Sequence, residues 1–313
     1  MKEVSPIFSN LKVEVQTLQN LPKLSKIQEI VEHYIFDGET LLSKSGRYAV
    51  KSKDGSFIVY TMRNHKAPLE LLYWIQLLKR GMTFVHASGA TYNEKALIFP
   101  AWPETGKTSL IVHLLGKSQV FQFLGDDMVI ISRNGDVYPY LKPFAVYLHH
   151  KNLFHNYFKN KPLCYLRLRV GHTLAKLGIY SRYLKSLKIM EPLWIPYSEI
   201  FPNRRPAEKG KLSLIYLLKK ADKFKLTPIE VEDAARLLCL HLIYDLIAPV
   251  LQDAIIFTHF GFFNIFNALE EHYKILCEAL EKSEEIVSCS ISGINDLNKL
   301  ADIILCKLKS HLF

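Results

Sequence analysis

The chain has 313 residues, of which 49% are hydrophobic and 22% charged. This composition excludes an intrinsically disordered protein and suffices for one large or two modest domains. Its 40 Lys and Arg residues against 30 Asp and Glu residues give a formal net charge of +10 at pH 7. Five cysteines, an odd number without close metal-type spacing, predict buried thiols in a reducing compartment.

Neither a membrane span nor a secretion signal is expected from the sequence. The longest apolar candidates, such as Leu237 to Leu251, are interrupted by His241 and Asp245. The first residues, Met1 to Pro6, lack the apolar core of a secretory signal. The sequence therefore predicts a cytoplasmic protein that does not associate with membranes.

Residues 1–65 predict a small β-rich N-terminal region. Leu11 to Val15 alternates apolar and polar residues, and His33 to Phe36 is a short β-prone run. Tyr48 to Met62 predicts a hairpin that turns at Asp54 and Gly55. Pro68 predicts the start of a helix that extends to Leu78. This helix belongs to the second expected domain, residues 66–313.

A phosphate-binding loop of the Walker A type is the most informative motif. An apolar run, Ala96 to Phe99, predicts the strand before it, and a helical pattern from Thr108 to Leu115 follows. In a loop of this type, which joins a strand to a helix, backbone N–H groups bind phosphate oxygens. Its lysine, here Lys107, reaches the β and γ phosphates, and the hydroxyl of its threonine, here Thr108, binds Mg²⁺. The predicted nucleotide-binding residues are Ala101, Trp102, Pro103, Glu104, Thr105, Gly106, Lys107, Thr108 and Ser109.

Two further groups flank this loop in the sequence. The apolar run from Val120 to Leu124 predicts a buried strand that ends in Gly125, Asp126 and Asp127. Paired carboxylates beside a phosphate loop can divide two tasks: binding Mg²⁺ and accepting the proton of an attacking hydroxyl. Upstream, the short run that starts at Met82 ends in His86, a candidate catalytic side chain, although a lone histidine is more often structural.

The chain resembles the kinase domain of HPr kinase/phosphorylase in the order of its segments. These are His86–Ala–Ser–Gly89, a hairpin, the phosphate loop, a helix, and a strand that ends in Asp–Asp. That domain is similar to the nucleotide-binding core of phosphoenolpyruvate carboxykinase. The resemblance covers residues 70–145 and continues at Lys211 to Leu218. It implies an α/β fold with a mixed sheet and ATP and Mg²⁺ as cofactors. By position it implies an active-site His86, a phosphate-binding Lys107, a metal-binding Thr108, and an Asp126–Asp127 pair that supplies metal binding and the proton acceptor.

Downstream, Asn134 and Gly135 predict a hairpin turn, after which a basic helical insert is expected at residues 145–195. From Val137 to Met190 the sequence holds no Asp or Glu but ten basic residues, which equal the net charge of the whole chain. Interleaved aromatic residues would suit an anionic partner such as a phosphorylated metabolite, an acidic peptide or RNA. The alternative is a solvated lid. The ten are Lys142, Lys151, Lys159, Lys161, Arg167, Arg169, Lys176, Arg182, Lys185 and Lys188.

The C-terminal third predicts a core strand at Leu212 to Leu218 and mostly helices after it. Just before that strand, Arg204 and Arg205 are candidates for binding the γ-phosphate or the substrate. Thr227 followed by a proline and Glu230 predicts the start of a helix that extends to about Ile247. The last predicted elements are helices at 253–259, 268–282 and 295–312 and a strand at 285–291.

Together these features predict a Mg²⁺-dependent kinase that transfers the γ-phosphate of ATP to a hydroxyl. The expected architecture is a phosphate-loop core of the HPr kinase and phosphoenolpyruvate carboxykinase type, with the N-terminal region and the insert added. The acceptor is left open between a small alcohol and a serine of a peptide or protein. The alternative is a kinase, or a nucleotide-dependent binding protein, that acts on RNA through residues 137–190. Assembly of several copies is also left open.

Overall fold

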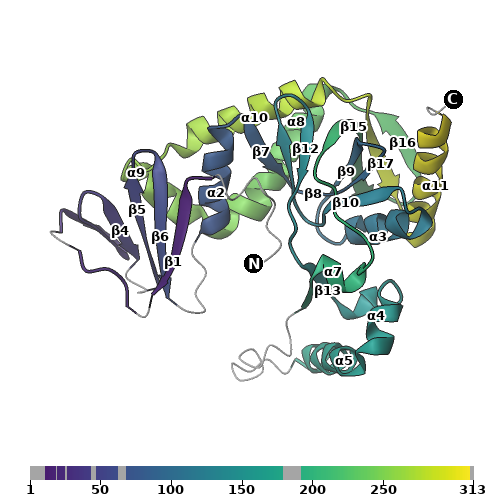
Figure 1. The fold of residues 1–313 in the computed structure, drawn as a ribbon, viewed down its shortest axis with the longest axis horizontal. Helices are drawn as coiled ribbons and strands as arrows, with labels where there is room; N and C mark the ends of the chain where they lie inside the picture. Colours follow the sequence, from purple (N-terminus) through teal and green to yellow (C-terminus); the bar gives the residue numbers. More distant parts are fainter. Residues whose placement is uncertain are drawn as a thin grey trace. The chain divides into compact units, whose positions relative to one another are not determined.

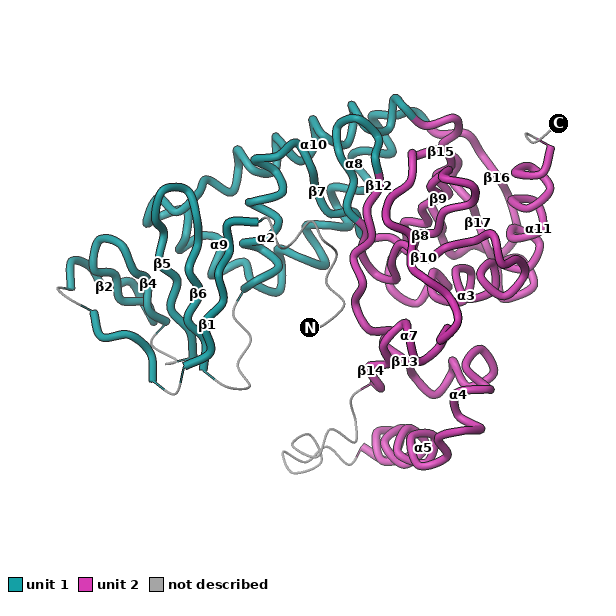
Figure 2. The backbone as a smooth tube through the Cα atoms, in the orientation of Figure 1, with its two compact units in different colours: residues 1–86, 130–136, 230–282 teal, residues 87–129, 137–229, 283–313 magenta. Residues whose placement is uncertain are grey.

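A computed structural model describes residues 11–18, 20–24, 27–43, 47–62, 68–178 and 192–310. The described residues form a mixed α/β protein with two mixed sheets (Figure 1). The backbone divides into two compact units, each assembled from three separate stretches of chain (Figure 2). Unit 1 comprises residues 1–86, 130–136 and 230–282, and unit 2 comprises residues 87–129, 137–229 and 283–313.

Unit 1 begins with a six-stranded sheet, and its strand order is β1-β6-β5-β4-β3-β2. The predicted hairpin is confirmed: β5 and β6 pair antiparallel, and Asp54 and Gly55 between them both have positive φ angles, 51° and 70°. That combination is typical of a tight hairpin turn. The strands are β1 (Val13–Leu18), β2 (Glu29–Val31), β3 (Tyr34–Phe36), β4 (Thr40–Ser43), β5 (Tyr48–Lys53) and β6 (Ser56–Met62).

The helices of unit 1 pack around a polar chain that is buried between them. Trp74 Nε1 on α2 (Leu69–Leu78) donates to Thr83 Oγ1 at 2.9 Å, and this oxygen lies 2.6 Å from His272 Nδ1. Thr83 belongs to β7 (Met82–Val85) and His272 to α10 (Ile265–Leu280). Burial lowers the pKa of His272 to about 3, so the ring is neutral in the folded protein.

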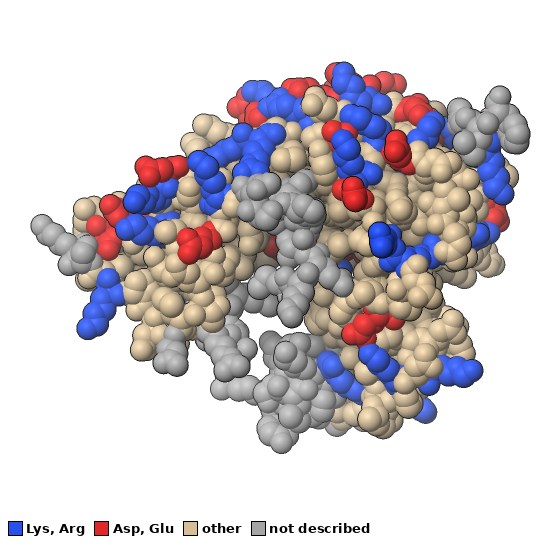
Figure 3. Space-filling model, viewed as in Figure 1, with Lys and Arg blue, Asp and Glu red and all other residues tan. Residues whose placement is uncertain are grey.

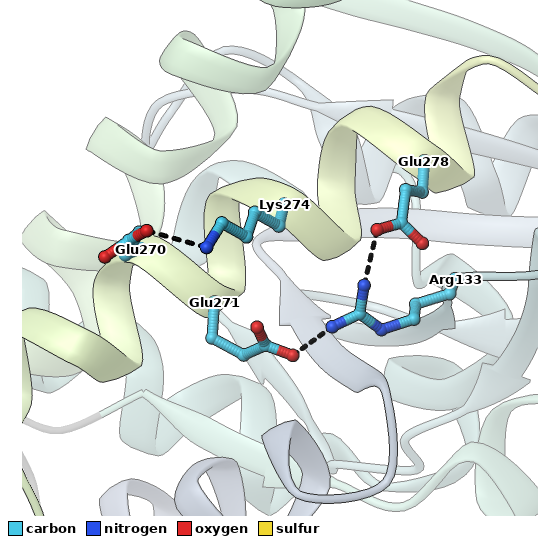
Figure 4. Close-up of polar contacts among 5 residues, drawn as sticks. All are labelled: Arg133, Glu270, Glu271, Lys274 and Glu278. Carbon is cyan, nitrogen blue, oxygen red and sulfur yellow. Dashed lines mark hydrogen bonds and ion pairs between the residues drawn. The ribbon is translucent and has the colours of Figure 1, made fainter.

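An ion-pair cluster on the surface of unit 1 joins α10 to the turn after β11 (Val129–Ser132). Arg133 forms ion pairs with both Glu271 and Glu278, which lie seven residues apart on the same helix (Figure 4). Lys274 pairs with Glu270 one turn away at 2.6 Å. Since these groups are partly exposed, they orient the turn more than they stabilise the unit.

A long helical stretch, Val231–His259, has the length and mean hydropathy (1.7) of a membrane-spanning helix, with 39% of its apolar window buried. Core helices of globular proteins share such a length and composition. The stretch comprises α8 (Val231–Leu242), a π-helical turn at Ile243–Ile247, a 3-10 turn at Ala248–Val250 and α9 (Leu251–His259). The expected lack of membrane association stays a prediction.

The predicted helix start at Thr227 is wrong. Thr227 and Pro228 end strand β16 (Lys225–Pro228), where they pair with Ser288 and Val287 of β17 (Glu285–Ile291). The helix α8 begins only at Val231, after Glu230. Pairing with a strand some 60 residues away outweighs the local capping signal, as tertiary context often does.

Unit 2 is built on strands in the order β10-β8-β9-β15, followed by β12 (Asp136–Pro139), with β17 also paired to β15. Strands β9, β15 and β17 are parallel, whereas β8 and β10 run antiparallel to their neighbours. Helices α3 and α11 lie together against one face, where Leu110 and Leu300 join a core with Phe99 and Tyr216 (Figure 1). The bounds are β8 (Ala87–Tyr92), β9 (Lys95–Pro100), α3 (Lys107–Lys117), β10 (Phe121–Gly125), β15 (Gly210–Lys220) and α11 (Ile294–Ser310).

The predicted insert leaves unit 2 through a two-stranded stem. Strand β13 (Phe144–Val146) pairs antiparallel with β14 (Leu193–Ile195), and α7 (Tyr197–Ile200) follows the stem. Between the two strands lie a 3-10 turn (Leu148–His150), α4 (His155–Asn160) and α5 (Pro162–Lys176), so the predicted helices are confirmed there. Arg182, Lys185 and Lys188 lie outside the described residues.

The five cysteines are free thiols, as expected, but they are not uniformly buried. Cys289, which lies within β17, is buried, and Cys306 on α11 is exposed. The other three, Cys164, Cys239 and Cys277, are half-buried. The expectation of buried thiols is therefore wrong for Cys306, because its position on α11 faces solvent.

We expect His272→Asn to flatten the acid dependence of stability, because Asn can keep a bond to Thr83 but does not titrate. The folded-state pKa of His272, about 3, is below its ordinary value of 6.5, so the unfolded chain binds more protons between these values. Its contribution is present above pH 6.5 and is lost as pH falls toward 3.

Urea unfolding at pH 7.5 and pH 5 measures this effect. The free energy of unfolding should drop more in the wild type than in His272→Asn, while the exposed-turn control His33→Asn should follow the wild type. An equal drop in the wild type and in His272→Asn would contradict the prediction.

Candidate functional site

The predicted phosphate loop lies in unit 2 in the expected context of strand, loop and helix. Strand β9 ends at Pro100, Ala101 makes a parallel bridge with Leu218, and α3 begins at Lys107. Gly106 is left-handed, with φ of 104°, and a Cβ atom there would lie 2.7 Å from Leu297 Cδ1. Glycine is therefore required at the last turn before the helix, both for the backbone angle and for the close approach of α11.

Lys107 folds back across the loop that precedes it. Its side chain is buried, and Nζ donates to the carbonyl oxygen of Ala101 at 2.8 Å. Thr105 closes the same loop by donating from Oγ1 to the carbonyl oxygen of Trp102 at 2.8 Å. The loop is thus ordered by its own side chains, and the lysine ammonium lies on its inner side.

A buried carboxylate joins three segments of unit 2. Asp126, directly after β10, accepts from Ser88 Oγ at 2.7 Å and from Thr108 Oγ1 at 2.9 Å. Ser88 belongs to β8 and Thr108 to the first turn of α3. The structure therefore brings together the predicted residues Thr108 and Asp126, with Lys107 beside Thr108 in the chain.

The pKa of Asp126 is raised to about 6, chiefly by burial and in addition by the neighbouring charge of Asp127. The two hydroxyl donors and Lys107 act in the opposite direction, because they stabilise the ionised carboxylate. Desolvation is the largest of these effects, so the environment of Asp126 carries too little positive charge for a buried carboxylate. A cation at this position would supply that charge.

Asp127 differs from Asp126 in its exposure to solvent and in its backbone conformation. It is exposed, and its φ angle of 87° lies in the left-handed region, which costs a non-glycine residue on the order of 1 kcal/mol. The turn requires glycine at position 125, because a Cβ atom there would lie 2.2 Å from the carbonyl oxygen of Met128. The sequence Gly–Asp–Asp thus separates one buried carboxylate from one solvent-facing carboxylate.

The residues fit a Mg²⁺ ion bound together with phosphates. Mg²⁺ takes oxygen ligands, commonly one or two from protein groups and the remainder from phosphates and water. The hydroxyl of Thr108 and the carboxylate of Asp126 already converge within 2.9 Å. Among the described residues there is no cluster of three or more His, Cys, Asp or Glu side chains of the kind that binds a metal without phosphate.

His86, the other predicted catalytic residue, belongs to unit 1. It follows β7 and is buried, and its Nδ1 lies 3.1 Å from Oδ2 of Asp245 in the π-helical turn. The ring of His241 also approaches it edge-on at 6.4 Å. Asp245 and His241 both belong to unit 1. A catalytic role for His86 stays a prediction.

Of the two predicted arginines, Arg204 has contacts that place it at the start of β10. Arg204 Nη1 donates to the carbonyl oxygens of Ser118 at 3.1 Å and Phe121 at 3.4 Å, before and at the start of β10. Asp126 follows the opposite end of that strand, roughly 16 Å away at about 3.3 Å per residue. Arg205 is exposed. Arg204 anchors the start of β10, and substrate contacts for either arginine stay a prediction.

On the insert, Lys151, Lys159 and Arg169 are exposed, and Figure 3 shows blue side chains scattered over this part of the surface. On its stem, Phe144, Val146, Leu193 and Ile195 face the core, whereas Trp194 on the opposite face is 58% exposed. Tyr147 continues β13 in extended conformation and is 46% exposed. Its side chain follows the alternation of Ala145, the strand partner of Trp194, so the two aromatic rings share one face of the stem.

Sequence reasoning missed Ser88 and Asp245 as partners of the predicted residues. Ser88 is set beside Asp126 by the antiparallel register of β8 and β10, in which Gly89 lies opposite Gly125. Its position two residues after His86, in a segment already singled out, is the only sequence signal for it. Asp245 is separated from His86 by more than 150 residues and was noted only as a charge that interrupts an apolar run.

We expect Asp126→Asn to stabilise the folded protein at neutral pH. The folded-state pKa of about 6 exceeds the ordinary value of 3.8, so the folded protein binds the extra proton between these values and stability falls as pH rises through them. The free energy of unfolding of Asp126→Asn should exceed that of the wild type by at most about 3 kcal/mol at pH 7.5, and this difference should shrink toward pH 4.

Urea unfolding at the two pH values, with the exposed Asp222→Asn as the control, checks this expectation. The control should follow the wild type at both values. A destabilised Asp126→Asn protein at pH 7.5, or a gain that does not change with pH, would show that the buried carboxylate does not carry the expected cost.

Comparison with known proteins adds no family to this picture. No family model and no curated protein sequence matches the chain.

Proposed function

We propose that this protein is a Mg²⁺-dependent kinase that transfers the γ-phosphate of ATP to a hydroxyl group. The observation that carries the proposal is the convergence of Thr108 Oγ1 and Asp126 Oδ2 within 2.9 Å at the helix that Lys107 begins. A phosphate loop alone would support nucleotide binding. A loop whose metal-binding hydroxyl is bonded to a buried carboxylate supports metal-assisted phosphoryl transfer.

The proposed nucleotide lies across the loop, at the N-terminus of α3, where backbone N–H groups and the helix dipole bind its phosphates. Lys107 would exchange its bond to Ala101 for the β and γ phosphates. Thr108 and Asp126 would hold Mg²⁺, which neutralises charge on the transferring group when bound. The same environment that raises the pKa of Asp126 therefore favours a divalent cation beside it.

In the proposed reaction, the acceptor oxygen forms a bond to the γ phosphorus while the bond to the β,γ-bridging oxygen breaks and ADP leaves. The acceptor proton passes to Asp127, whose side chain is exposed to solvent, from which the acceptor enters. His86 is proposed, from the family resemblance alone, to orient that hydroxyl. The HPr kinase-like core remains the fold we propose, supported by the order of β8, β9, loop, α3 and β10.

A small alcohol and a serine of a peptide both satisfy this chemistry. The stretch from Val137 to Met190, which lacks Asp and Glu, favours an acceptor that carries negative charge, since Lys151, Lys159 and Arg169 are exposed on it. An acidic peptide that presents a serine is the acceptor class that these charges fit best.

RNA is a second candidate partner, favoured by one specific observation. Trp194 and Tyr147 are exposed on one face of the stem, beside helices that lack acidic side chains. Exposed aromatic rings next to basic residues are typical of surfaces on which single-stranded bases stack. This candidate differs from the first in the partner and leaves the nucleotide site unchanged.

We expect Lys107→Ala to lower ATP-dependent phosphorylation of cell-extract acceptors by about 10²–10⁴-fold, because the ammonium no longer neutralises the transferring phosphate. Asp127→Asn should lose turnover to a similar extent while binding ATP with wild-type affinity, measured by calorimetry. Lys117→Ala, which changes a lysine at the other end of α3, is the matched control and should retain full activity. Normal turnover by Asp127→Asn would remove its role as proton acceptor.

We expect the partner class to be resolved by titrating the protein with a single-stranded RNA and with an acidic serine peptide at several salt concentrations. RNA binding through the stem would fall steeply with salt, and Trp194→Ala together with Tyr147→Ala would weaken it about tenfold or more. Binding of the peptide alone, unaffected by the two substitutions, would exclude the RNA alternative.

A further inference from the structure

A pocket of about 300 Å³ lies in unit 2 beside the phosphate loop. It opens between the loop, the end of β15 and the connection from β17 to α11. Residues that line it include Gly106, Ser109, Lys220, Ala221, Ser292 and Ile294. Its volume is at the lower end of small-molecule sites, which suits part of a nucleotide better than the whole.

The position of the pocket follows from the sheet. Strands β9, β15 and β17 are parallel, and their carboxyl ends are aligned by the pairings Ala101 with Leu218 and Lys220 with Ile291. Ligands of open α/β sheets bind outside the carboxyl ends of parallel strands. The pocket occupies that edge next to the loop that ends β9.

The pocket and the Asp126 cluster meet the loop on different sides. Thr108 bonds to Asp126, whereas the next residue, Ser109, lines the pocket. Successive residues on a helix point about 100° apart, so these two side chains leave α3 in different directions. A phosphate chain lying over the N-terminus of α3 would therefore have its terminal group at Asp126 and its other end at the pocket.

We propose that this pocket binds the nucleoside of the nucleotide, an inference that rests on the proposed function. Ile291 and Leu297 supply an apolar floor for the base, and Ile294, 58% exposed, supplies an apolar rim. Lys220 also lines the pocket, opposite in charge to Glu104, and would favour the phosphate nearest the sugar. The site explains why an isoleucine is exposed at the first position of α11.

Helix α11 contributes both to the pocket and to the support of the phosphate loop. Leu297 lines the pocket and also contacts the position of Gly106, whose left-handed turn aims the loop N–H groups. A bound nucleoside would therefore pack against the same side chain that supports the phosphate loop. Nucleoside binding and phosphate binding are coupled through that contact.

Gly293 offers a sharp test, because it lines the pocket and a Cβ atom added there meets nothing within 4 Å. Gly293→Phe should fill the pocket without a backbone clash. Gly116→Phe is the matched control: Gly116 also has open space around its Cβ position and lies on α3, outside the pocket. Ile294→Asn, at an exposed position, removes the apolar rim without filling the pocket.

The experiment measures binding of Mg–ATP and of inorganic tripolyphosphate to each protein by calorimetry. We expect the wild type to prefer ATP, and Gly293→Phe to lose at least tenfold in ATP affinity while its tripolyphosphate affinity stays within twofold. Ile294→Asn should lose ATP affinity to a smaller degree, and Gly116→Phe should match the wild type.

The outcomes separate the inference from the proposed function. If the wild type binds ATP no better than tripolyphosphate, or if Gly293→Phe binds ATP as the wild type does, the pocket does not take the nucleoside, although the phosphate site stands. If the wild type binds neither ligand, the proposed function fails and the inference falls with it.

Discussion

The candidate site depends on one buried carboxylate. Asp126 accepts hydrogen bonds from Ser88 and Thr108, and through them it fixes the end of β10 against the start of β8 and the first turn of α3. Gly125 makes this possible because the turn after it leaves no room for a Cβ atom. Two hydroxyl donors do not offset the burial of the charge, as the raised pKa shows. A protein that keeps an ionisable group under such conditions gives up stability, and that cost is understandable where a cation is bound during function.

Local signals predicted the parts of the fold that short stretches of sequence determine by themselves. Asp54–Gly55 supplied the positive φ angles of a hairpin, and the apolar run before Ala101 and the helical pattern after Lys107 placed β9 and α3. The helix start at Thr227 was mispredicted, because β17 provides a strand partner that no local pattern reveals. Propensity fails in this way wherever a distant strand completes a sheet.

The same limit applies to the site. Lys107, Thr108 and Asp126 could be named from the sequence because the spacing of a phosphate loop and a strand that ends in Asp–Asp are local patterns. Ser88 depends on the register of β8 with β10, and the pocket depends on the alignment of β15 with β17, so neither has a signal in one short stretch. The pairing of His86 with Asp245 joins residues from distant parts of unit 1, and the contact of Arg204 with the carbonyl oxygen of Ser118 likewise joins distant segments of the chain.

The arrangement of unit 2 indicates how the surface of the insert could change while the proposed nucleotide site stays the same. The phosphate loop, Asp126 and the pocket all lie at the ends of strands and helices of unit 2, whose apolar side chains form one buried core. The insert is joined to unit 2 by the paired strands β13 and β14, and its helices also reach the core, because Phe154, Phe158 and Leu168 belong to the same buried cluster as Phe123. Trp194 and Tyr147 are exposed, so substitutions at these two residues would change the surface of the insert at little cost to that core. Substitutions around Leu297 would instead disturb the loop and the pocket together, since that side chain contacts both. In the function we propose, the exposed face of the insert would contact the partner, whereas the edge of the unit 2 sheet would hold the nucleotide.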